Sequence, residues 1–188
     1  MKKILEIKGY SKKLIDLIVD CLNKDKVIIM PSDTIYGFLT KTKNEQRLRE
    51  IKRRDEKPFL HLISRYSQLS LLNIDPEIYI EILQKNWPGN ISFIMNDINN
   101  KKLGVRMPDF EELRNILDRV NEPLLSTSVN FSGMNTLNNP EDIIKNFSEL
   151  VDLIIIDKNF KEKLASTIVD LTTSPYTIIR KGDKEFIC

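Results

Sequence analysis

The clearest chemistry in this sequence lies in a cationic stretch that precedes an apolar run, Ile51-Lys52-Arg53-Arg54-Asp55-Glu56-Lys57-Pro58. Arginine presents a planar fork of donors that matches phosphate or carboxylate oxygens, and lysine presents a compact point charge. The two together suit a polyphosphate better than either one alone. The same run at a helix end could instead lie in water and interact with the negative end of the helix dipole. What the rest of the chain places nearby must decide between these interpretations.

Two hydroxyl-rich segments follow apolar runs and could supply neutral donors to the same ligand. The first, Ser32-Asp33-Thr34-Ile35-Tyr36-Gly37, leaves the apolar run 27–30, where open α/β folds place ligand contacts. The second, residues 126–133, can hold an oxyanion or a base edge through its hydroxyls and backbone N–H groups. Either segment could also be an ordinary polar or capping turn.

Several isolated polar residues lie within or beside apolar runs. Arg106 falls inside the run 103–107 and needs a carboxylate partner or an anionic ligand, because an unpaired buried charge costs several kcal/mol. Both alternatives stay open. The only histidine, His61, fits a structural role better than a catalytic one, since no partner acid is evident. Ser166 and Arg180 lie at the ends of two later runs, where they could border a cleft or lie on the surface.

The sequence lacks the compact nucleotide-binding and catalytic motifs. It contains no Gly-x-x-x-x-Gly-Lys loop, no Gly-x-Gly-x-x-Gly turn, no Gly-x-Ser-x-Gly elbow and no His/Cys cluster, so we expect no metal held by protein side chains. A nucleotide site must therefore use dispersed groups. No general base stands out, and a cleft rich in cations and hydroxyls suits transfer at phosphorus, where positioning and charge neutralisation supply most of the rate.

Composition limits the remaining possibilities. The 188 residues, 41% hydrophobic and 30% charged, predict one domain, 1–188, with one buried core. Lys and Arg number 29 against 27 for Asp and Glu, and the net charge of +2 predicts no general attraction to nucleic acid or membrane. Two cysteines, Cys21 and Cys188, indicate no disulfide framework. No apolar run is long enough to span a bilayer, so we expect a soluble cytoplasmic protein.

Hydrophobic periodicity predicts the elements that must position these residues. We expect helices at 11–25, 44–53, 76–85, 109–120 and 140–147, the first capped by Ser11 and the fourth by Asp109. We expect strands at 27–30, 59–63, 91–95, 103–107, 123–125, 153–156, 166–171 and 176–181. Strands and helices alternate, but the chain ends in adjacent strands. This order predicts an α/β fold, a twisted mixed β-sheet flanked by helices with a concave cationic cleft.

Six motifs follow one another along the chain: Pro31-Ser32-Asp33-Thr34-Ile35-Tyr36-Gly37, Lys52-x-Arg54-x-x-Lys57-Pro58, Trp87-Pro88-Gly89, Val105-Arg106-x-Pro108, Ser126-Thr127-Ser128-Val129-Asn130-x-Ser132-Gly133 and Ser166-Thr167-x-Val169-Asp170. With these motifs the chain resembles the YrdC-like threonylcarbamoyl-AMP synthases in their short, single-domain form. The similarity runs from about Ser11 to Arg180, and the order and spacing of the motifs also match.

This resemblance implies an enzyme that joins L-threonine, bicarbonate or CO2 and ATP into threonylcarbamoyl-adenylate and pyrophosphate, with Mg2+ accompanying ATP. A downstream threonylcarbamoyl transferase complex then modifies a tRNA adenosine next to the anticodon. The resemblance implies catalytic roles for Lys52 and Arg54. ATP is expected to contact Lys52, Arg54, Lys57, Ser126, Ser128, Asn130, Thr136 and Arg180, and threonine to contact Thr34, Arg106, Ser128 and Ser166.

Two other functions stay open. A cationic cleft could hold an RNA backbone without catalysis, and weak binding of tRNA or other RNA is compatible with either function. The near-zero net charge and the absence of a stacking-aromatic motif disfavour this alternative. The chain could also be a related carbamoyl-adenylate enzyme, as in hydrogenase-maturation proteins, but the acylphosphatase and zinc-finger segments of those proteins are absent. His61 is one residue out of register with a histidine of some relatives and takes no role from them.

Overall fold

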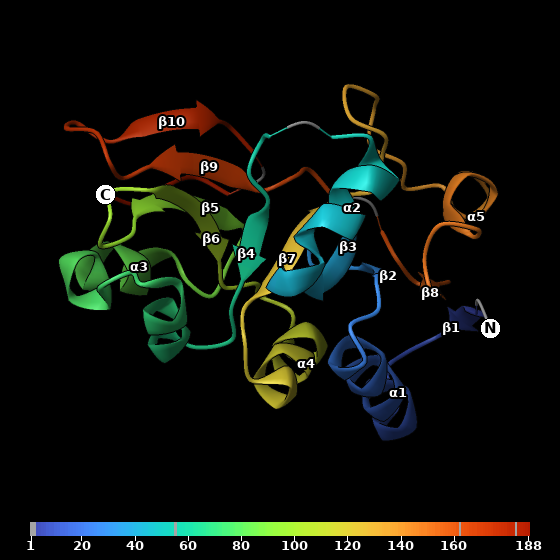
Figure 1. Cartoon of the computed structure of the whole chain (residues 1–188). Coiled ribbons are helices and arrows are strands. Elements are labelled where there is room, and N and C mark those ends of the chain that lie inside the picture. The colour runs from blue at the N-terminus through green and yellow to red at the C-terminus, as the bar shows by residue number, and fades with distance from the viewer. Residues whose placement is uncertain (1–2, 55, 162, 183) are drawn as a thin grey trace.

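A twisted sheet runs through the whole protein (Figure 1), and the computed structural model describes residues 3–54, 56–161, 163–182 and 184–188. Within these residues ten strands lie in the order β1-β8-β2-β3-β7-β4-β6-β5-β9-β10. The sheet is mixed, since β4 pairs parallel with β6 but antiparallel with β7. The strands are β1 (Lys3–Ile7), β2 (Ile28–Pro31), β3 (Tyr36–Lys41), β4 (Leu60–Leu62), β5 (Ile91–Asn96), β6 (Lys102–Arg106), β7 (Leu124–Ser128), β8 (Leu153–Asp157), β9 (Thr167–Asp170) and β10 (Thr177–Arg180).

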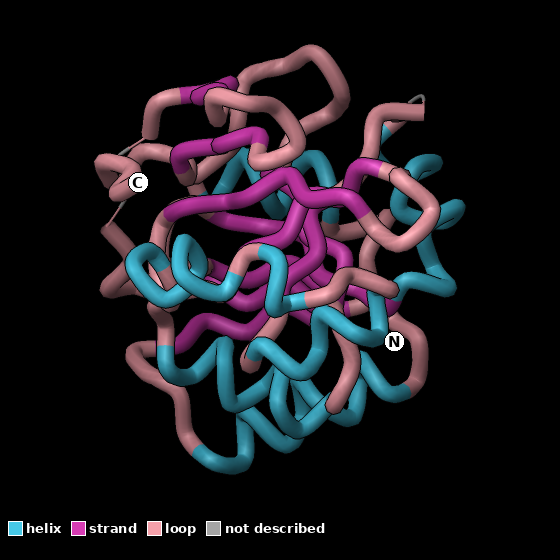
Figure 2. Tube along the Cα trace, turned by 90° about the vertical axis from the view of Figure 1, so that its left-hand side faces the viewer, coloured by secondary structure: helices cyan, strands magenta, loops and turns pink. Residues whose placement is uncertain are grey.

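Helices cover the sheet, and Figure 2 shows several of them gathered along one side of the strands. They are α1 (Lys12–Asn23), α2 (Glu45–Lys52), α3 (Ile80–Asn86), α4 (Glu111–Val120) and α5 (Pro140–Phe147), with short 3-10 helices at Thr42–Asn44, Tyr66–Leu72 and Pro76–Ile78. Ser11 caps α1, because its Oγ accepts a hydrogen bond of 3.3 Å from the Leu14 N–H. Among the described residues, no helix has the length and apolarity needed to cross a bilayer.

The buried side chains form three clusters, and their arrangement leaves part of one sheet face uncovered, at β4, β5 and β6. Residues of α1 and α4 pack on one face of the central strands, whereas residues of α2 and α5 pack on the other. Near β5 and β6, α3 and the 3-10 helix Tyr66–Leu72 contribute to a core that contains Ile91, Phe93 and Met95. Side chains alternate along a strand, so Ser92 and Ile94 face the opposite side, where they line a cavity.

The mixed α/β fold expected from the sequence is confirmed, with four differences in detail. Strands β1 and β3 were not predicted. The predicted helix 76–85 is divided into the 3-10 helix Pro76–Ile78 and α3. Asp109 does not cap α4, which begins after Phe110 without a side-chain cap; the Asp109 N–H instead donates to Asp33 Oδ2 at 3.0 Å.

Strand β3 exists because the first hydroxyl-rich segment closes a turn between β2 and β3. The Ser32 N–H donates to the Ile35 carbonyl at 3.2 Å, and the Ser32 hydroxyl donates to the same oxygen at 2.7 Å. This side-chain bond stabilises the turn locally. The chain then returns antiparallel to β2, with Pro31 opposite Tyr36.

Candidate functional site

A cavity of about 630 Å³ lies on the uncovered part of this sheet face. Leu60 of β4 lies in its floor, in register with Gly104 of β6 and Ser126 of β7. No carboxylate occurs among its described lining residues, although five cations do: Arg54, Lys57, Lys102, Arg106 and Arg180. A hollow lined by one sign of charge concentrates ligands of the opposite sign. The cavity is therefore suited to an anionic ligand.

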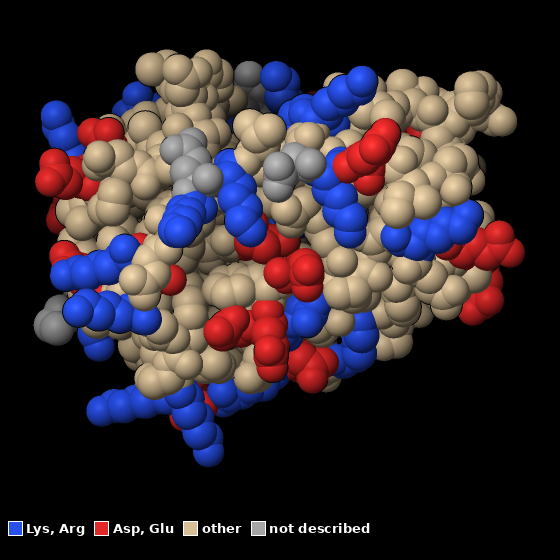
Figure 3. All heavy atoms as spheres, turned by 180° about the vertical axis from the view of Figure 1, so that it is seen from behind, with Lys and Arg blue, Asp and Glu red and all other residues tan. Residues whose placement is uncertain are grey.

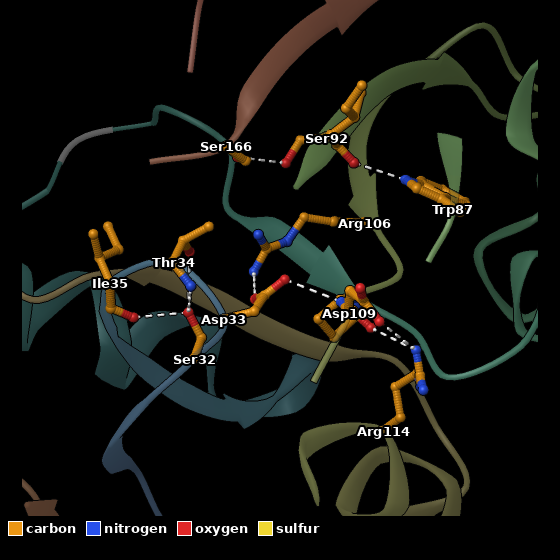
Figure 4. A network of polar contacts seen from close by, with 12 residues as sticks. Ser32, Asp33, Thr34, Ile35, Trp87, Ser92, Arg106, Asp109, Arg114 and Ser166 are labelled. Carbon is orange, nitrogen blue, oxygen red and sulfur yellow. Dashed lines mark hydrogen bonds and ion pairs between the residues drawn. The ribbon is translucent and has the colours of Figure 1, made fainter. Parts of the chain in front are cut away.

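Arg106 lies at one end of this cavity, and only one of its guanidinium nitrogens is paired with a carboxylate. Its Nη2 donates to Asp33 Oδ1 at 2.9 Å, and the two side chains are only 5% and 4% exposed (Figure 4). Burial lowers the pKa of Arg106, while the Asp33 carboxylate opposes that shift. Nε and Nη1 are buried without a partner in the structure. Both alternatives for Arg106 therefore apply to different nitrogens of one side chain: Nη2 is bound to a carboxylate, and Nε and Nη1, on opposite sides of the guanidinium, each keep a donor for another acceptor.

Hydroxyl groups surround this Arg106 end. Ser92 Oγ and Ser166 Oγ lie 2.9 Å apart, and Figure 4 marks this contact with a dashed line. Arg180 holds Ser166 in place, because its Nε and Nη2 donate to the Ser166 carbonyl at 3.1 and 2.8 Å and Nη2 also lies 3.3 Å from Ser166 Oγ. Thr34 lines the cavity from the β2–β3 turn, with its Oγ1 3.0 Å from Ser32 Oγ. This end can form directional hydrogen bonds to a small polar molecule.

Arg54 and Lys57 line the cavity from the loop between α2 and β4. The loop begins at Arg53, whose left-handed backbone with φ of 50° ends α2. Arg54 is held by its own loop, since Nε donates to the Lys57 carbonyl at 3.1 Å and Nη2 to the Pro58 carbonyl at 2.8 Å. Its Nη1 lies 3.4 Å from Thr127 Oγ1. Burial, and then the nearby Arg49 charge, lowers the pKa of Arg54.

Lys52 lies behind the cavity wall rather than in it. Its side chain is buried, and its Nζ donates to the Ser128 carbonyl at 2.6 Å and to the Asn130 carbonyl and Oδ1 at 2.8 and 2.7 Å. These bonds use all three ammonium donors. Burial, and then the charge of Arg54, lowers the pKa of Lys52 to about 7. Lys52 therefore fixes residues 128–130, and its predicted contact with ATP stays a prediction.

The structure brings most of the predicted site residues together. Eight of them line the cavity: Thr34, Arg54, Lys57, Arg106, Ser126, Ser128, Ser166 and Arg180. Asn130 is joined to them through Ser128, whose Oγ donates to Asn130 Oδ1 at 2.9 Å. Thr136 is exposed and does not line the cavity. His61 Nδ1 lies 3.3 Å from the Gly104 carbonyl, and burial lowers the pKa of its ring, which fits a structural role.

Sequence reasoning assigned no individual role to Asp33, although it named the segment 32–37, and it missed Ser92 and Lys102. Lys102 could have been found by alternation, because it lies four positions from the predicted site residue Arg106 on the same strand. Ser92 could not, because no residue of its strand was predicted to line the site. Asp33 could not, since its partner Arg106 is 73 residues away in the chain.

Two further observations bear on the function: the possible metal ligands and the charge of the surface. Among the described residues, no three His, Cys, Asp or Glu side chains are placed to hold a metal ion. The face in Figure 3 carries basic and acidic side chains interspersed, in keeping with the net charge of +2. That face is therefore not a continuous basic surface of the kind that binds nucleic acid.

A family model, individual protein sequences and a solved structure all show similarity between this chain and one group of proteins. The Sua5/YciO/YrdC family model, described as telomere recombination, matches residues 20–182. Escherichia coli K12 uncharacterized protein YciO is 27% identical over 187 residues, covering 92% of this chain and 90% of YciO. A putative threonylcarbamoyl-AMP synthase of Methanocaldococcus jannaschii is 27% identical over 182 residues, covering 91% and 86%. The crystal structure of Pyrococcus abyssi Sua5 complexed with L-threonine has the same fold, with a TM-score of 0.85 and 21% identity over 95% of this chain and 57% of that chain.

Proposed function

Because this chain belongs to the Sua5/YciO/YrdC family, we propose that it is a threonylcarbamoyl-AMP synthase. It would join L-threonine, CO2 derived from bicarbonate, and ATP into threonylcarbamoyl-adenylate and pyrophosphate. The observation that carries the proposal is Arg106, two of whose nitrogens are buried without a hydrogen-bond partner. The cavity that it lines contains four other cations and no carboxylate among its described lining residues. The similar P. abyssi Sua5 binds L-threonine.

Threonine is assigned to the Arg106 end of the cavity. Either of the two unpaired Arg106 nitrogens, Nε or Nη1, could donate to the amino acid carboxylate. A ligand carboxylate would satisfy donors that are otherwise buried without a partner, and such donors cost about 1–3 kcal/mol or more when charged. Ser166, Ser128 and Thr34 supply hydroxyls to the same ligand.

Catalysis of this reaction depends more on holding the reactants in line and neutralising the charge of the phosphates than on proton transfer. The neutral amine of threonine attacks CO2 and releases one proton to solvent, which gives a carbamate. A carbamate oxygen then attacks the α-phosphorus of ATP, while the bond from that phosphorus to the pyrophosphate oxygen breaks. Arg54 and Lys57 would offset the charge on the departing pyrophosphate. Holding two reactants in line can supply about 7 kcal/mol of the barrier or more in ideal cases.

Magnesium is proposed to arrive with ATP. The cavity lining offers cations and hydroxyls but no described carboxylate, so it suits a metal ion that phosphate oxygens hold. The ion would supply additional charge neutralisation on the phosphates. Under this proposal the product passes to a transferase complex that acts on tRNA in the cytoplasm.

The decisive experiment measures pyrophosphate release from ATP and Mg2+ with and without L-threonine and bicarbonate. We expect release that requires threonine. Arg54→Ala should lose most of this activity while remaining folded, because its guanidinium lines the cavity. Arg53→Ala is the matched control, since Arg53 does not line the cavity and stacks on Phe131 at 4.6 Å.

Four outcomes would contradict the proposal. Fresh enzyme could show no threonine-dependent release, or Arg54→Ala could turn over normally. Activity that requires carbamoyl phosphate in place of threonine would assign the related carbamoyl-adenylate reaction. Salt-sensitive tRNA binding without nucleotide binding would assign an RNA-binding module.

A further inference from the structure

Ser92 is a neighbour of Arg106 on the open part of the sheet. Strands β5 and β6 are antiparallel, with Phe93 opposite Val105. One residue further along each strand come Ser92 and Arg106, and both line the cavity. Side chains of such cross-strand neighbours on one face are close enough to share a ligand. A small molecule that Arg106 holds is therefore within reach of Ser92.

Ser92 is joined to Ser166 in a nearly dry part of the cavity wall. The two Oγ atoms lie 2.9 Å apart, and the residues are only 2% and 6% exposed. In Figure 4 the Arg106 side chain lies between this serine pair and Asp33. Asp33 occupies Nη2 of Arg106 from one side. The serine pair is therefore placed to meet a ligand that Arg106 binds through its other nitrogens.

The serine pair keeps hydrogen-bonding capacity of both kinds. Two hydroxyls have two O–H donors and four acceptor positions, and the bond between them uses one of each. Arg180 Nη2 lies 3.3 Å from Ser166 Oγ and takes a second acceptor position. Among the described residues, no acceptor is within hydrogen-bonding distance of the remaining O–H. One donor and two acceptor positions are therefore left for a ligand.

This capacity fits a ligand hydroxyl better than a ligand charge. An ammonium only donates and a carboxylate only accepts, whereas a hydroxyl does both. An apolar side chain completes the surroundings, because Ile168 lies opposite Ser92 on β9 and also lines the cavity. A hydroxyl pair beside an isoleucine suits a carbon that carries both a hydroxyl and a methyl group. The β-carbon of threonine has these two substituents.

We propose that Ser92 is a specificity-determining residue, which with Ser166 binds the side-chain hydroxyl of a β-hydroxy amino acid whose carboxylate lies on Arg106. The inference rests on the proposed function and adds a selectivity residue to its site. A site built to hydrogen-bond a substrate hydroxyl rejects the analogue that lacks it, because the buried polar groups are then left unpaired.

The simpler alternative is that the serine pair only joins β5 to the segment that leads into β9. Under that alternative, loss of the Ser92 hydroxyl changes stability or weakens all amino acids alike. Under the proposal, the loss weakens only those ligands that carry the hydroxyl. The ratio of two binding constants therefore separates the interpretations.

The experiment is calorimetric titration of L-threonine and of L-2-aminobutyrate, which is threonine without its hydroxyl, into wild type and Ser92→Ala. We expect wild type to bind threonine more than tenfold tighter than 2-aminobutyrate. Ser92→Ala should weaken threonine binding about tenfold, the effect of one lost hydrogen bond, and leave 2-aminobutyrate within about twofold. Ser70→Ala is the control, since Ser70 is exposed and does not line the cavity, and both affinities should match wild type.

Two further variants separate selectivity from folding. Ser92→Thr keeps the hydroxyl and should retain the preference for threonine. Ser92→Cys keeps nearly the same volume but forms weak hydrogen bonds, so it should lose the preference and serves if Ser92→Ala does not fold. An unchanged ratio of the two affinities in a folded Ser92→Ala or Ser92→Cys variant would overturn the assignment. Equal affinity of wild type for the two amino acids would do the same.

Failure of the proposed function gives a different pattern. If wild type shows no threonine-dependent release of pyrophosphate yet selects threonine through Ser92, the reaction assignment fails and the selectivity site stands. If release is present and the ratio does not depend on Ser92, the selectivity assignment fails and the reaction stands. If wild type binds neither amino acid, the Ser92 assignment is overturned regardless of turnover.

Discussion

The two ends of the cavity use cations in different ways. At one end, Arg106 is nearly dry and is bound to an equally buried Asp33. At the other end, Lys57 is exposed, and Arg54 is held by backbone carbonyls of its own loop. The dry end fixes the position of each donor, whereas the wet end provides charge that can adjust to a ligand.

This difference predicts a division of labour. A buried charge acts in a low effective dielectric and loses little strength to salt, but it must be paired to remain in the fold. An exposed charge is cheap to maintain and is screened by salt over about 8 Å at physiological ionic strength. The Arg106 end is therefore suited to selecting a small substrate, and the end with Arg54 and Lys57 to attracting a highly charged one.

The largest expected effect comes from breaking the dry end. Arg106→Ala leaves the Asp33 carboxylate buried without its partner and should lower the free energy of unfolding by about 3–5 kcal/mol. It should also abolish detectable threonine binding. Denaturant unfolding and threonine titration measure the two effects.

The matched variant for this experiment is the double substitution Asp33→Asn with Arg106→Gln. It removes both charges together, so it should recover much of the lost stability while threonine still fails to bind. Threonine binding by the folded double variant would show that Arg106 does not hold the substrate and would remove the contrast between the ends.

The dry end also shows where sequence reasoning stops. Arg106 inside an apolar run was enough to predict a partner or a ligand, because the cost of an isolated buried charge is general. Its partner could not be predicted, since Asp33 is 73 residues distant and only the folded sheet brings them together. In the same way, local periodicity found β5 and β6, but β3 depended on a turn bond from Ser32 that no periodic pattern reveals.

The sequence predicted which cations lie near the wet end, but it could not predict which of them are buried. The spacing of Lys52, Arg54 and Lys57 indicated a common ligand, and two of them do line the cavity. The third, Lys52, is directed to carbonyl oxygens of residues 128 and 130. A helix end sets which residues are near a loop, but tertiary packing decides which of them are buried.

Lys52 provides a second, smaller test through the pH dependence of stability. Its pKa falls from 10.5 to about 7 on folding, mainly through burial. Below about pH 7 both states bind the proton; between about pH 7 and 10.5 only the unfolded state does. The free energy of unfolding should therefore rise with pH across this window, by an amount on the order of a few kcal/mol at most.

The measurement compares denaturant unfolding of wild type and Lys52→Met from pH 7 to 10. Lys52→Met should be less stable throughout, because it leaves the Ser128 and Asn130 carbonyls without their donor, but its stability should rise less with pH. Comparison of the slopes cancels the other groups that titrate in this range. Equal slopes would mean that Lys52 keeps its proton. Lys52 would then be protonated like the cations that line the cavity.

The smallest expected effect compares the two ends directly in one protein by changing only the salt concentration. Raising monovalent salt from about 0.05 to 0.5 M shortens the screening length from more than 10 Å to less than 8 Å. The affinity for ATP or pyrophosphate should fall several-fold, since Lys57 lines the cavity and is exposed. L-threonine affinity should change less than about twofold, because Arg106 and Asp33 are sealed from solvent. Calorimetric titration of each ligand at both salt concentrations measures the contrast. Equal salt sensitivity for the two ligands would mean that threonine and the phosphates meet similarly solvated charges, and the assignment of one ligand to each end would have to be given up.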